Sequence, residues 1–495
     1  MTGLSAEHIH ELGPAVVTPQ YDRTSTRVGI VHFGVGGFHR AHQALYIDEL
    51  LNLGDLSWGI CGVGVQPFDA KMRDVLADQD RLYTLLTVEP NGTSAARVVG
   101  SIVRYLYAPD DPPAVLDQLA DPAVAIVSLT ITEGGYGIND ATGEFDPNDP
   151  AVLGDLSGQD PPASALGYIV AGLAARRTAG AAPFTVMSCD NIQGNGSITR
   201  HAVMAFARRL DPDLAEWISD EVAFPNSMVD RITPVTDAET VAAVAAVGIH
   251  DQWPVRSESF RQWVLEDTFP AGRPALERVG VQLVADVHPY ELMKLRLLNA
   301  SHQAMSYLGI LSGLTFVHEV LEQPHYREFL LTYMHREAIP TLDHVPGVDL
   351  PTYCEHLLER FGSRAIQDTL ARQVVDASDR IPKFLLPVVA EQLRRDGRIA
   401  CISLVLASWS VYLERGLDGS LPQELVDKRA MGLLDAVARE SSLPGSFLDF
   451  TPVFGDLGRN RRLRDAFVTA RVGLAEMGPI HSALAAVSEE PGGPN

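Results

Sequence analysis

Long hydrophobic runs and paired cysteines are missing from this sequence of 495 residues. Its longest apolar stretch, from Ile399 to Leu413, is shorter than the roughly 20 residues that a membrane-spanning helix needs. The 4 cysteines lie far apart, with no C-x-x-C pair and no histidine at ligand spacing, so neither a disulfide framework nor a zinc site is indicated. The amino-terminal segment carries acidic residues and lacks the apolar core of a secretory signal. These absences favour a cytoplasmic protein.

Basic charge is scarce too, with 39 lysine and arginine residues against 63 aspartate and glutamate residues and a formal net charge of −24. The basic residues occur as scattered pairs, such as Arg176-Arg177, rather than as a stripe with interleaved aromatic residues. Nucleic acid and anionic membranes are therefore not expected as partners. The acidity is typical of a soluble, self-repelling surface.

Lysine itself is rare, because the basic residues are nearly all arginine. A guanidinium stays protonated, whereas an ammonium can be tuned to release its proton. A retained lysine is therefore a hint of chemistry that arginine cannot perform. The sequence holds only Lys71, Lys294, Lys383 and Lys428.

The composition, 46% apolar and 21% charged, is typical of a globular protein. The length predicts about two to four domains, and two large ones suffice. The first half begins with a β-branched run, 27–34, which breaks on glycine and predicts a buried strand. A helix over 38–53 and a second strand over 58–65 are expected to follow, so the chain starts with a βαβ unit.

Strands and helices go on alternating through the rest of the first half. Two strands, 83–88 and 97–106, flank a Pro90-Asn91-Gly92 turn and predict a β-hairpin. The segment 137–162 is rich in Asp, Gly and Pro and predicts a long loop. The remaining expected elements are strands over 124–131 and 184–188 and helices over 164–177 and 198–210. Such alternation predicts a parallel sheet covered by helices on both faces.

Beyond Val287 strand-like runs nearly vanish and amphipathic windows dominate. We therefore expect an α/β domain over 1–287 and a second, mainly helical domain over 288–495. The expected helical windows are 291–308, 326–339, 384–395 and 399–413.

The first candidate site is the Gly34-x-Gly36-x-x-His39 sequence between the first strand and its helix. In this context glycines let backbone N–H groups approach a pyrophosphate at a helix N-terminus. A tight turn without a ligand explains the glycines as well. The third position holds His39 in place of Gly or Ala, so close packing of helix on strand must be achieved in another way.

An acidic residue after the second strand would bind the ribose hydroxyls of a dinucleotide and disfavour a 2′-phosphate. Asp69 is the best placed candidate, although its spacing from Gly36 is longer than usual. Lys71 and Arg73 nearby leave room for NADP. As a solvated loop acid, Asp69 would need no function.

The helix expected over 291–308 carries the strongest cluster, which consists of Lys294, Asn299 and His302. At about 100° per residue, His302 lies roughly 80° and Asn299 roughly 140° from Lys294, so all three can face one half of the helix. Alcohol oxidation needs a base for the hydroxyl proton and fixed donors for the oxygen. A buried lysine suits the first task, and an amide and an imidazole suit the second. The alternative is an interface helix with a snorkelling lysine and a hydrogen-bonded core histidine.

Three more polar residues each keep two interpretations. Asn191 closes an expected strand, where it would donate to a ligand or cap the next helix. Asp230 would accept from substrate hydroxyls or pair with Arg231 or another arginine. Glu291 would relay protons or pair along its helix.

Six motifs follow one another along the chain: GVGGFHRAHQ (34–43), SLTITEGGY (128–136), CDN (189–191), FPNSMVDRITP (224–234), WVLEDTF (263–269) and KLRLLNASH (294–302). Together they resemble the motifs of the polyol-specific long-chain dehydrogenases, and they are most like those of the members that oxidise mannitol. The resemblance runs in order from about Gly29 to Lys383.

This resemblance implies a Rossmann-type amino-terminal domain with an extended mixed sheet, a mostly α-helical carboxyl-terminal domain and catalysis in the cleft between them. It implies NAD as the cofactor and no metal. It further implies Lys294 as general base, Asn191 and Asn299 as oxyanion-stabilising amides, and His302 as a substrate-positioning residue. The implied cofactor contacts are Gly34, Gly36, Gly37, Phe38, Asp69, Thr132 and Glu133.

Substrate contacts are implied at Asp230, Arg372 and Arg380, with Glu291 near the proton exit. The implied reaction oxidises a polyol at C2 to a ketose, D-mannitol and NAD⁺ giving D-fructose and NADH, in a monomer or alternatively a dimer. Reduction of fructuronate or tagaturonate is the nearest rival, because the two arginines would supply cations for a carboxylate. Arg380 stands where many relatives are expected to have lysine, which leaves the preferred substrate open. The other rival is a nucleotide-binding regulatory protein without turnover.

Overall fold

The structure is a computed structural model that describes residues 3–139, 144–158, 161–476 and 480–489. The chain divides into two compact units. The first contains Met1–Glu89 and Thr93–His288, and the second contains Pro90–Gly92 and Pro289–Asn495. Across the described ranges, none of the helices is long and apolar enough to cross a membrane.

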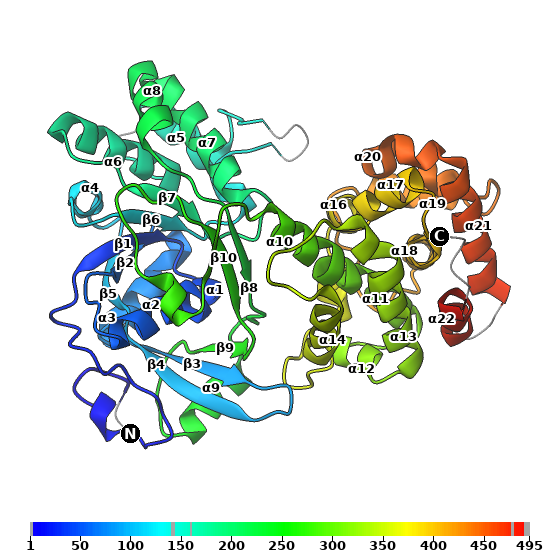
Figure 1. Cartoon of the computed structure of the whole chain (residues 1–495), viewed down its shortest axis with the longest axis horizontal. Coiled ribbons are helices and arrows are strands. Elements are labelled where there is room, and N and C mark those ends of the chain that lie inside the picture. The colour runs from blue at the N-terminus through cyan, green and yellow to red at the C-terminus, as the bar shows by residue number, and fades with distance from the viewer. Residues whose placement is uncertain (1–2, 140–143, 159–160, 477–479, 490–495) are drawn as a thin grey trace. The chain divides into compact units, whose positions relative to one another are not determined.

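A five-stranded sheet forms the centre of the first unit (Figure 1). Its strands are β1 (Val28–Phe33), β2 (Gly59–Gly64), β5 (Ile102–Tyr107), β6 (Ile126–Leu129) and β7 (Thr185–Ser188). They run parallel in the order β5-β2-β1-β6-β7. Val31 and Phe33 of β1 pack into one core and Ile30 into another, because successive side chains of a strand face opposite sides.

Helices supply the other half of both cores, so the sheet is covered on both faces (Figure 1). One core takes side chains from α4 (Pro112–Ala120), α6 (Ala165–Ala179), α7 (Asn195–Leu210) and α8 (Pro212–Glu221). The other takes them from α2 (Gln43–Asn52) and α3 (Ala70–Asp78). The predicted α/β fold class, with a covered parallel sheet, is confirmed.

Mixed pairing occurs in two smaller sheets of the first unit. One has the order β11 (Gln282–Val284), β10 (Gln262–Glu266), β8 (Ser227–Asp230). The other has the order β4 (Ser94–Val99), β3 (Tyr83–Val88), β9 (Val255–Glu258). Each contains one parallel and one antiparallel pair.

Three predicted elements of the first unit differ in detail from the structure. The strand expected over 97–106 is wrong, because Gly100 and Ser101 separate β4 from β5 and the Gly100 N–H donates to Asp48. The helix expected over 38–53 is interrupted at His42, whose φ of −120° and ψ of −92° divide α1 (Gly37–Ala41) from α2.

The third difference lies in the loop expected over 137–162. It contains a helix, α5 (Pro150–Leu156), which begins at a proline, the residue type best tolerated in a first helical turn. Part of that expected loop, 140–143 and 159–160, lies outside the described residues.

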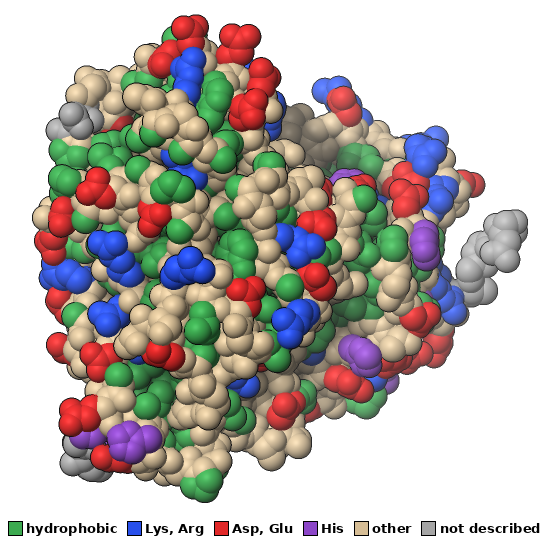
Figure 2. Space-filling model, turned by 60° about the vertical axis from the view of Figure 1, so that its left-hand side comes forward, with side chains coloured by type: hydrophobic (Ala, Val, Ile, Leu, Met, Phe, Trp, Pro, Cys, Tyr) green, Lys and Arg blue, Asp and Glu red, His purple; other side chains and the backbone are tan. Residues whose placement is uncertain are grey.

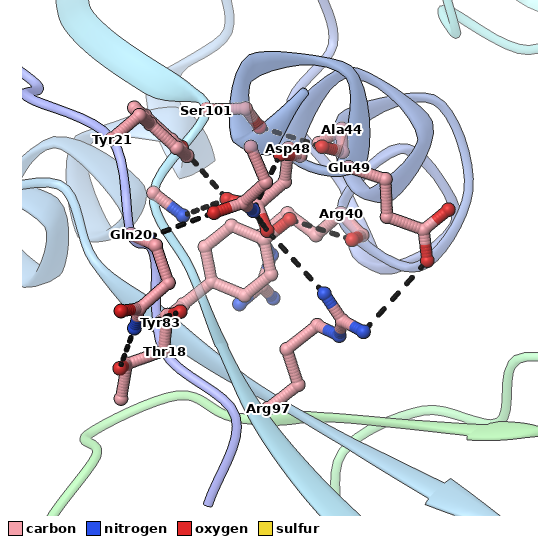
Figure 3. A network of polar contacts seen from close by, with 12 residues as sticks. Thr18, Gln20, Tyr21, Arg40, Ala44, Asp48, Glu49, Tyr83, Arg97 and Ser101 are labelled. Carbon is pink, nitrogen blue, oxygen red and sulfur yellow. Dashed lines mark hydrogen bonds and ion pairs between the residues drawn. The ribbon is translucent and has the colours of Figure 1, made fainter. Parts of the chain in front are cut away.

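Side-chain hydrogen bonds hold α1 and α2, the helices that follow the glycine sequence (Figure 3). The Tyr83 hydroxyl donates to the carbonyl of Arg40 at 2.6 Å, and the Ser101 hydroxyl donates to that of Ala44 at 2.6 Å. The buried Asp48 carboxylate accepts from the Tyr21 hydroxyl at 2.7 Å, and burial raises its pKa to about 6. These bonds join the end of α1 to β3 and the first turn of α2 to the residue that precedes β5.

The second unit is helical, and its described residues pair as β-structure only in the single bridge between Phe316 and Thr369. The buried helix α11 (Ala300–Leu311) packs against α18 (Ala400–Leu417). The other α-helices described are α10 (His288–Met293), α12 (Val317–Leu321), α13 (Pro324–Thr332), α14 (Leu350–Phe361), α15 (Leu370–Gln373), α16 (Ala377–Phe384), α17 (Leu386–Arg394), α19 (Ala430–Ala438), α20 (Thr451–Phe454), α21 (Arg461–Glu476) and α22 (Ile480–Glu489). The described residues also form two π-helices, η5 (Lys294–Asn299) and η6 (Tyr333–Ala338), and the short 3-10 helices η7 (Ile339–Thr341), η8 (Ser446–Asp449) and η9 (Gly455–Arg459). Acidic and basic side chains are interspersed over the face seen in Figure 2, as the scattered charges of the sequence predict.

Candidate active site

The glycine sequence forms a tight turn at the carboxyl end of β1. Gly34 has a φ of +88°, and a Cβ there would lie 2.1 Å from the carbonyl oxygen of Thr130, so no other residue fits. A Cβ at Gly36 or Gly37 would come no closer than 3.9 and 3.8 Å to its nearest neighbour. The first glycine is thus required by the turn, whereas a Cβ at either of the next two would make one ordinary van der Waals contact.

His39 replaces the small third residue of the glycine sequence by stacking on a second histidine. Its ring lies 3.5 Å, centroid to centroid, from the ring of His32 in β1, with 14° between the planes. The ring of His32 is hydrogen bonded to the hydroxyls of Ser128 at 2.8 Å and Thr130 at 3.0 Å. Burial lowers the pKa of both imidazoles, that of His32 to about 3, so they pack as neutral rings. Helix and strand are therefore joined by two flat rings.

Asp69 lies five residues beyond β2, in a 3-10 turn, and its carboxylate folds back toward the strand. One oxygen, Oδ2, accepts from the N–H groups of Val65 and Gln66, each at 2.9 Å. Burial raises the pKa of this carboxyl group. Asp69 is therefore a turn-forming residue at the carboxyl edge of the sheet rather than a solvated loop acid.

Two further predicted site segments leave the same edge of the sheet. Thr132 and Glu133 follow β6, and Asn191 follows β7. Asn191 is exposed and does not cap the next helix, because the N-cap of α7 is Gly194. The carboxyl ends of parallel strands are where open α/β sheets bind their ligands. Four strands thus contribute predicted site residues to this edge.

Asp230 ends β8 in one of the smaller sheets and is buried. The neighbouring Arg231 directs its guanidinium at backbone carbonyls, donating to Ala41 at 2.5 Å and to Glu258 at 2.8 and 3.0 Å. The Arg231 donors are therefore directed at these carbonyls and not at the Asp230 carboxylate, as the predicted pairing with Arg231 would require.

In the second unit the predicted catalytic residues lie on one continuous helical segment, α10–η5–α11. Lys294 and His302 are each 7% exposed, and Asn299 is half-buried. Lys294 and Asn299 are the first and last residues of the π-helix η5. Hydrogen bonds in a π-helix join residues five apart, so these two come nearer to one face than the α-helical angle of roughly 140° allows. Such single π turns occur frequently at functional sites.

Glu291 precedes Lys294 by three residues and is also 7% exposed. His302 packs its ring against Phe361, with 4.6 Å between the centroids. Three buried titratable side chains, those of Glu291, Lys294 and His302, therefore lie along this segment from α10 into α11.

Arg372 and Arg380 are held by a second group of contacts in the same unit. The guanidinium of Arg372 donates to Asp368 through Nε and Nη2, both at 2.8 Å, and this fork raises the pKa of the arginine. Arg380 donates from Nη1 to the carbonyl of Gln373 at 2.9 Å and to that of Arg372 at 3.2 Å. Burial acts to raise the pKa of Asp368, but the hydrogen bond from Arg372 and the nearby His302 outweigh it and lower that pKa. Asp368 thus holds Arg372 and lies near His302, although the sequence reasoning did not select it.

Among the side chains that the structure describes, no three or more of His, Cys, Asp and Glu gather as metal ligands would.

Known proteins resemble this chain along nearly its whole length. The family model described as the mannitol dehydrogenase Rossmann domain matches residues 28–278, and the one described as the mannitol dehydrogenase C-terminal domain matches residues 286–474. The mannitol 2-dehydrogenase of Phaeosphaeria nodorum is 48% identical over 89% of this chain and 78% of its own length. That of Aspergillus fumigatus is 47% identical over 90% of this chain and 91% of its own length.

Solved structures give the same result. The Pseudomonas fluorescens mannitol 2-dehydrogenase in ternary complex with NAD and D-mannitol is 42% identical, with a TM-score of 0.87 over 99% of this chain and 100% of that one. A D-sorbitol dehydrogenase in substrate-free form is 37% identical, with a TM-score of 0.88 over 97% of this chain and 100% of that one. The chain therefore belongs to the mannitol dehydrogenase family.

Proposed function

We propose that the protein is an NAD-dependent polyol dehydrogenase that oxidises D-mannitol at C2 to D-fructose, reversibly, with Lys294 as the general base. The domain over 1–287 is assigned the dinucleotide and the domain over 288–495 the substrate. Family membership supports the reaction class, because the solved Pseudomonas relative binds NAD and D-mannitol.

The carboxyl edge of the parallel sheet fits a dinucleotide. The lack of close neighbours around Gly36 and Gly37 suits an approach of pyrophosphate oxygens to the backbone, and the Asp69 carboxylate, after the neighbouring strand β2, suits ribose hydroxyls. The assigned contacts in this turn also include Gly34 and Phe38, and those after β6 are Thr132 and Glu133. NAD⁺ bound there would accept a hydride from the carbinol carbon.

The observation that carries the proposal is the burial of Lys294, which is 7% exposed on its helical segment. Nearly all other basic residues of the chain are arginine. In its neutral form the Lys294 amine would take the proton of the C2 hydroxyl. The amides of Asn191 and Asn299 would donate to that oxygen as it gains negative charge. His302 would hold a neighbouring hydroxyl, Asp230 would accept from another, and Glu291 would pass the proton onward.

The contacts of Arg372 favour a neutral polyol over a uronate. Its guanidinium already forms a two-bond fork with Asp368, the geometry in which an arginine would otherwise grip a substrate carboxylate. Nη1 of Arg380 is directed at two backbone carbonyls. Both arginines are therefore proposed to shape the outer end of the substrate site rather than to neutralise an acid.

Side-by-side kinetics test the proposal. NAD⁺ and NADP⁺ reduction is measured with D-mannitol, D-sorbitol and D-arabinitol, and NADH oxidation with D-fructose, D-fructuronate and D-tagaturonate, all with and without EDTA. We expect the highest kcat/KM with D-mannitol, D-fructose and NAD(H), unchanged by the chelator.

Other outcomes each reject a defined part of the proposal. Preference for a uronate would transfer the assignment to uronate reduction, and loss of activity in EDTA would contradict the metal-free lysine mechanism. NADH binding without turnover of any polyol or ketose would favour a regulatory protein.

A further inference from the structure

The buried side chain of Asp190 joins the loops that follow two neighbouring strands. The residue is 7% exposed, and its carboxylate accepts three hydrogen bonds. Oδ1 accepts from the N–H of Thr132 at 2.9 Å, and Oδ2 accepts from the N–H of Ile131 at 3.1 Å and from the hydroxyl of Tyr136 at 2.7 Å. All three donors belong to the loop after β6, whereas Asp190 itself follows β7.

The loop after β6 needs such support, because its backbone is strained. Thr132 has a φ of +60° and a ψ of 171°, a conformation that residues other than glycine rarely adopt. Residues in such conformations persist only where their surroundings enforce them, and they concentrate at functional sites. The Asp190 carboxylate holds the N–H of this residue and that of the residue before it.

The main chain of Asp190 is fixed as well. Its N–H donates to the Ser188 hydroxyl at 3.2 Å, and its carbonyl accepts from the Asn195 amide at 3.0 Å. The same amide donates to the carbonyl of Ser227 at 2.9 Å. Asn191 therefore follows a residue that is held through its N–H, its carbonyl and its side chain.

We propose that Asp190 is a positioning residue that holds the Thr132 turn and the Asn191 carboxamide in one fixed arrangement, an inference that rests on the proposed function. Thr132 and Glu133 are assigned to the cofactor and Asn191 to the substrate oxygen. One buried carboxylate would thus align the hydride acceptor with one of the donors that stabilise the developing charge.

A carboxylate is needed at this position because every partner is a donor. In Asp190→Asn, either orientation of the amide would place its NH2 group against the N–H of Ile131 or of Thr132, so at least one backbone bond is lost. Tyr136→Phe removes the hydroxyl bond to Asp190, together with the 2.8 Å bond between the same hydroxyl and Ser188, and leaves both backbone bonds to Asp190 in place. The two variants therefore form a graded series.

Asp155 provides a matched control in the same unit. It is 6% exposed and accepts from the N–H groups of Ala163 and Ser164 at 2.7 and 2.9 Å and from the Ser164 hydroxyl at 2.6 Å. The bonding pattern equals that of Asp190, but its partners lie at the start of α6 and include no assigned site residue. Asp155→Asn therefore reports the structural cost of the same chemical change.

The experiment compares full-length Asp190→Asn, Tyr136→Phe and Asp155→Asn with the natural sequence. NADH affinity is measured by fluorescence titration. The constants kcat and KM for D-mannitol are measured at saturating NAD⁺, and the midpoint of thermal unfolding is measured without ligands. For Asp190→Asn we expect the NADH Kd to rise at least about fivefold and kcat to fall at least about 20-fold. For Asp155→Asn we expect both within about twofold of the natural protein, at a similar loss of thermal midpoint. Tyr136→Phe is expected between them.

A double variant tests whether Asp190 acts through its neighbour. If it positions Asn191, then Asp190→Asn combined with Asn191→Ala lowers kcat hardly more than Asn191→Ala alone. Multiplicative losses, or an Asp190→Asn protein with the NADH affinity and kcat of Asp155→Asn, would overturn the inference while leaving the proposed function intact. A natural protein that turns over no polyol would reject the proposed function instead, and NADH titration would still decide whether Asp190 shapes the cofactor site. If Asp190→Asn does not fold, Tyr136→Phe carries the same test.

Discussion

The two groups of predicted site residues, one in each unit, are built by different means. At the carboxyl edge of the first unit's sheet, the conformation of the backbone defines the predicted site. Gly34 makes a turn that no side chain fits, and Asp69 and Asp190 accept hydrogen bonds from backbone N–H groups. On the helical segment of the second unit, side chains do the work, and the backbone contributes one widened turn between Lys294 and Asn299. Substitutions that add atoms are therefore expected to disturb the first group through its folding, and substitutions that remove a functional group are expected to disturb the second through its turnover.

The sharpest form of this contrast lies within the glycine turn itself. In Gly34→Ala the new Cβ would lie 2.1 Å from the Thr130 carbonyl at a φ of +88°, so we expect a loss of about 3 kcal/mol or more in the free energy of unfolding. Gly36→Ala meets nothing closer than 3.9 Å, and it should unfold like the natural protein but bind NADH more weakly. Denaturant unfolding and NADH titration of both variants measure this. Equal stability of the two variants would break the comparison.

On the helical side, removing one donor should leave the fold and lower the rate. Asn299→Ala deletes a half-buried amide from η5, and we expect kcat for D-mannitol to fall about 100-fold, with a thermal midpoint close to that of the natural protein. Steady-state kinetics with D-mannitol provide the measurement. A change in kcat of less than about threefold would remove Asn299 from the proposed machinery.

The stacked histidines give the smallest effect, and it depends on pH. The unfolded state binds a proton on His32 below about pH 6.5, whereas the folded state does so only near its pKa of about 3. Stability therefore falls as the pH drops through this window, by about 1 kcal/mol for this imidazole at pH 5.5. Thermal unfolding between pH 7.5 and 5.5 should show a shallower pH dependence for His32→Asn than for the exposed-site control His325→Gln. Identical slopes would contradict the buried, neutral stack.

Glycine, strand and spacing patterns predict the backbone that carries the first group of site residues, because steric requirements restrict which residues can stand there. The β1 strand, the turn at Gly34 and the covered parallel sheet all follow from such patterns. The break at Gly100 is missed, since a strand-like run on both sides hides the point where the chain changes sheets. The stacking of His39 on His32 is missed because it joins residues of two different elements.

The local geometry of the second group of site residues is harder to predict from the sequence. Helical periodicity finds the segment that carries Lys294, Asn299 and His302, but it assumes an α-helix and so misjudges the angle between the first two. Nothing local in the sequence indicates a π turn. Asp190 and Asp368 are missed for a related reason, since their partners become visible only once the chain is folded, although Asp190 stands next to a selected residue.

The proposed lysine base is tested most directly by Lys294→Ala and Lys294→Arg beside Lys428→Ala, an exposed lysine of the same unit. Alanine removes the base, and arginine keeps its proton. Both changes at Lys294 should therefore lower kcat for D-mannitol oxidation at least about 1,000-fold, with the NADH Kd within about twofold of that of the natural protein. Lys428→Ala should retain full turnover. Substantial turnover by Lys294→Arg or Lys294→Ala would contradict the account.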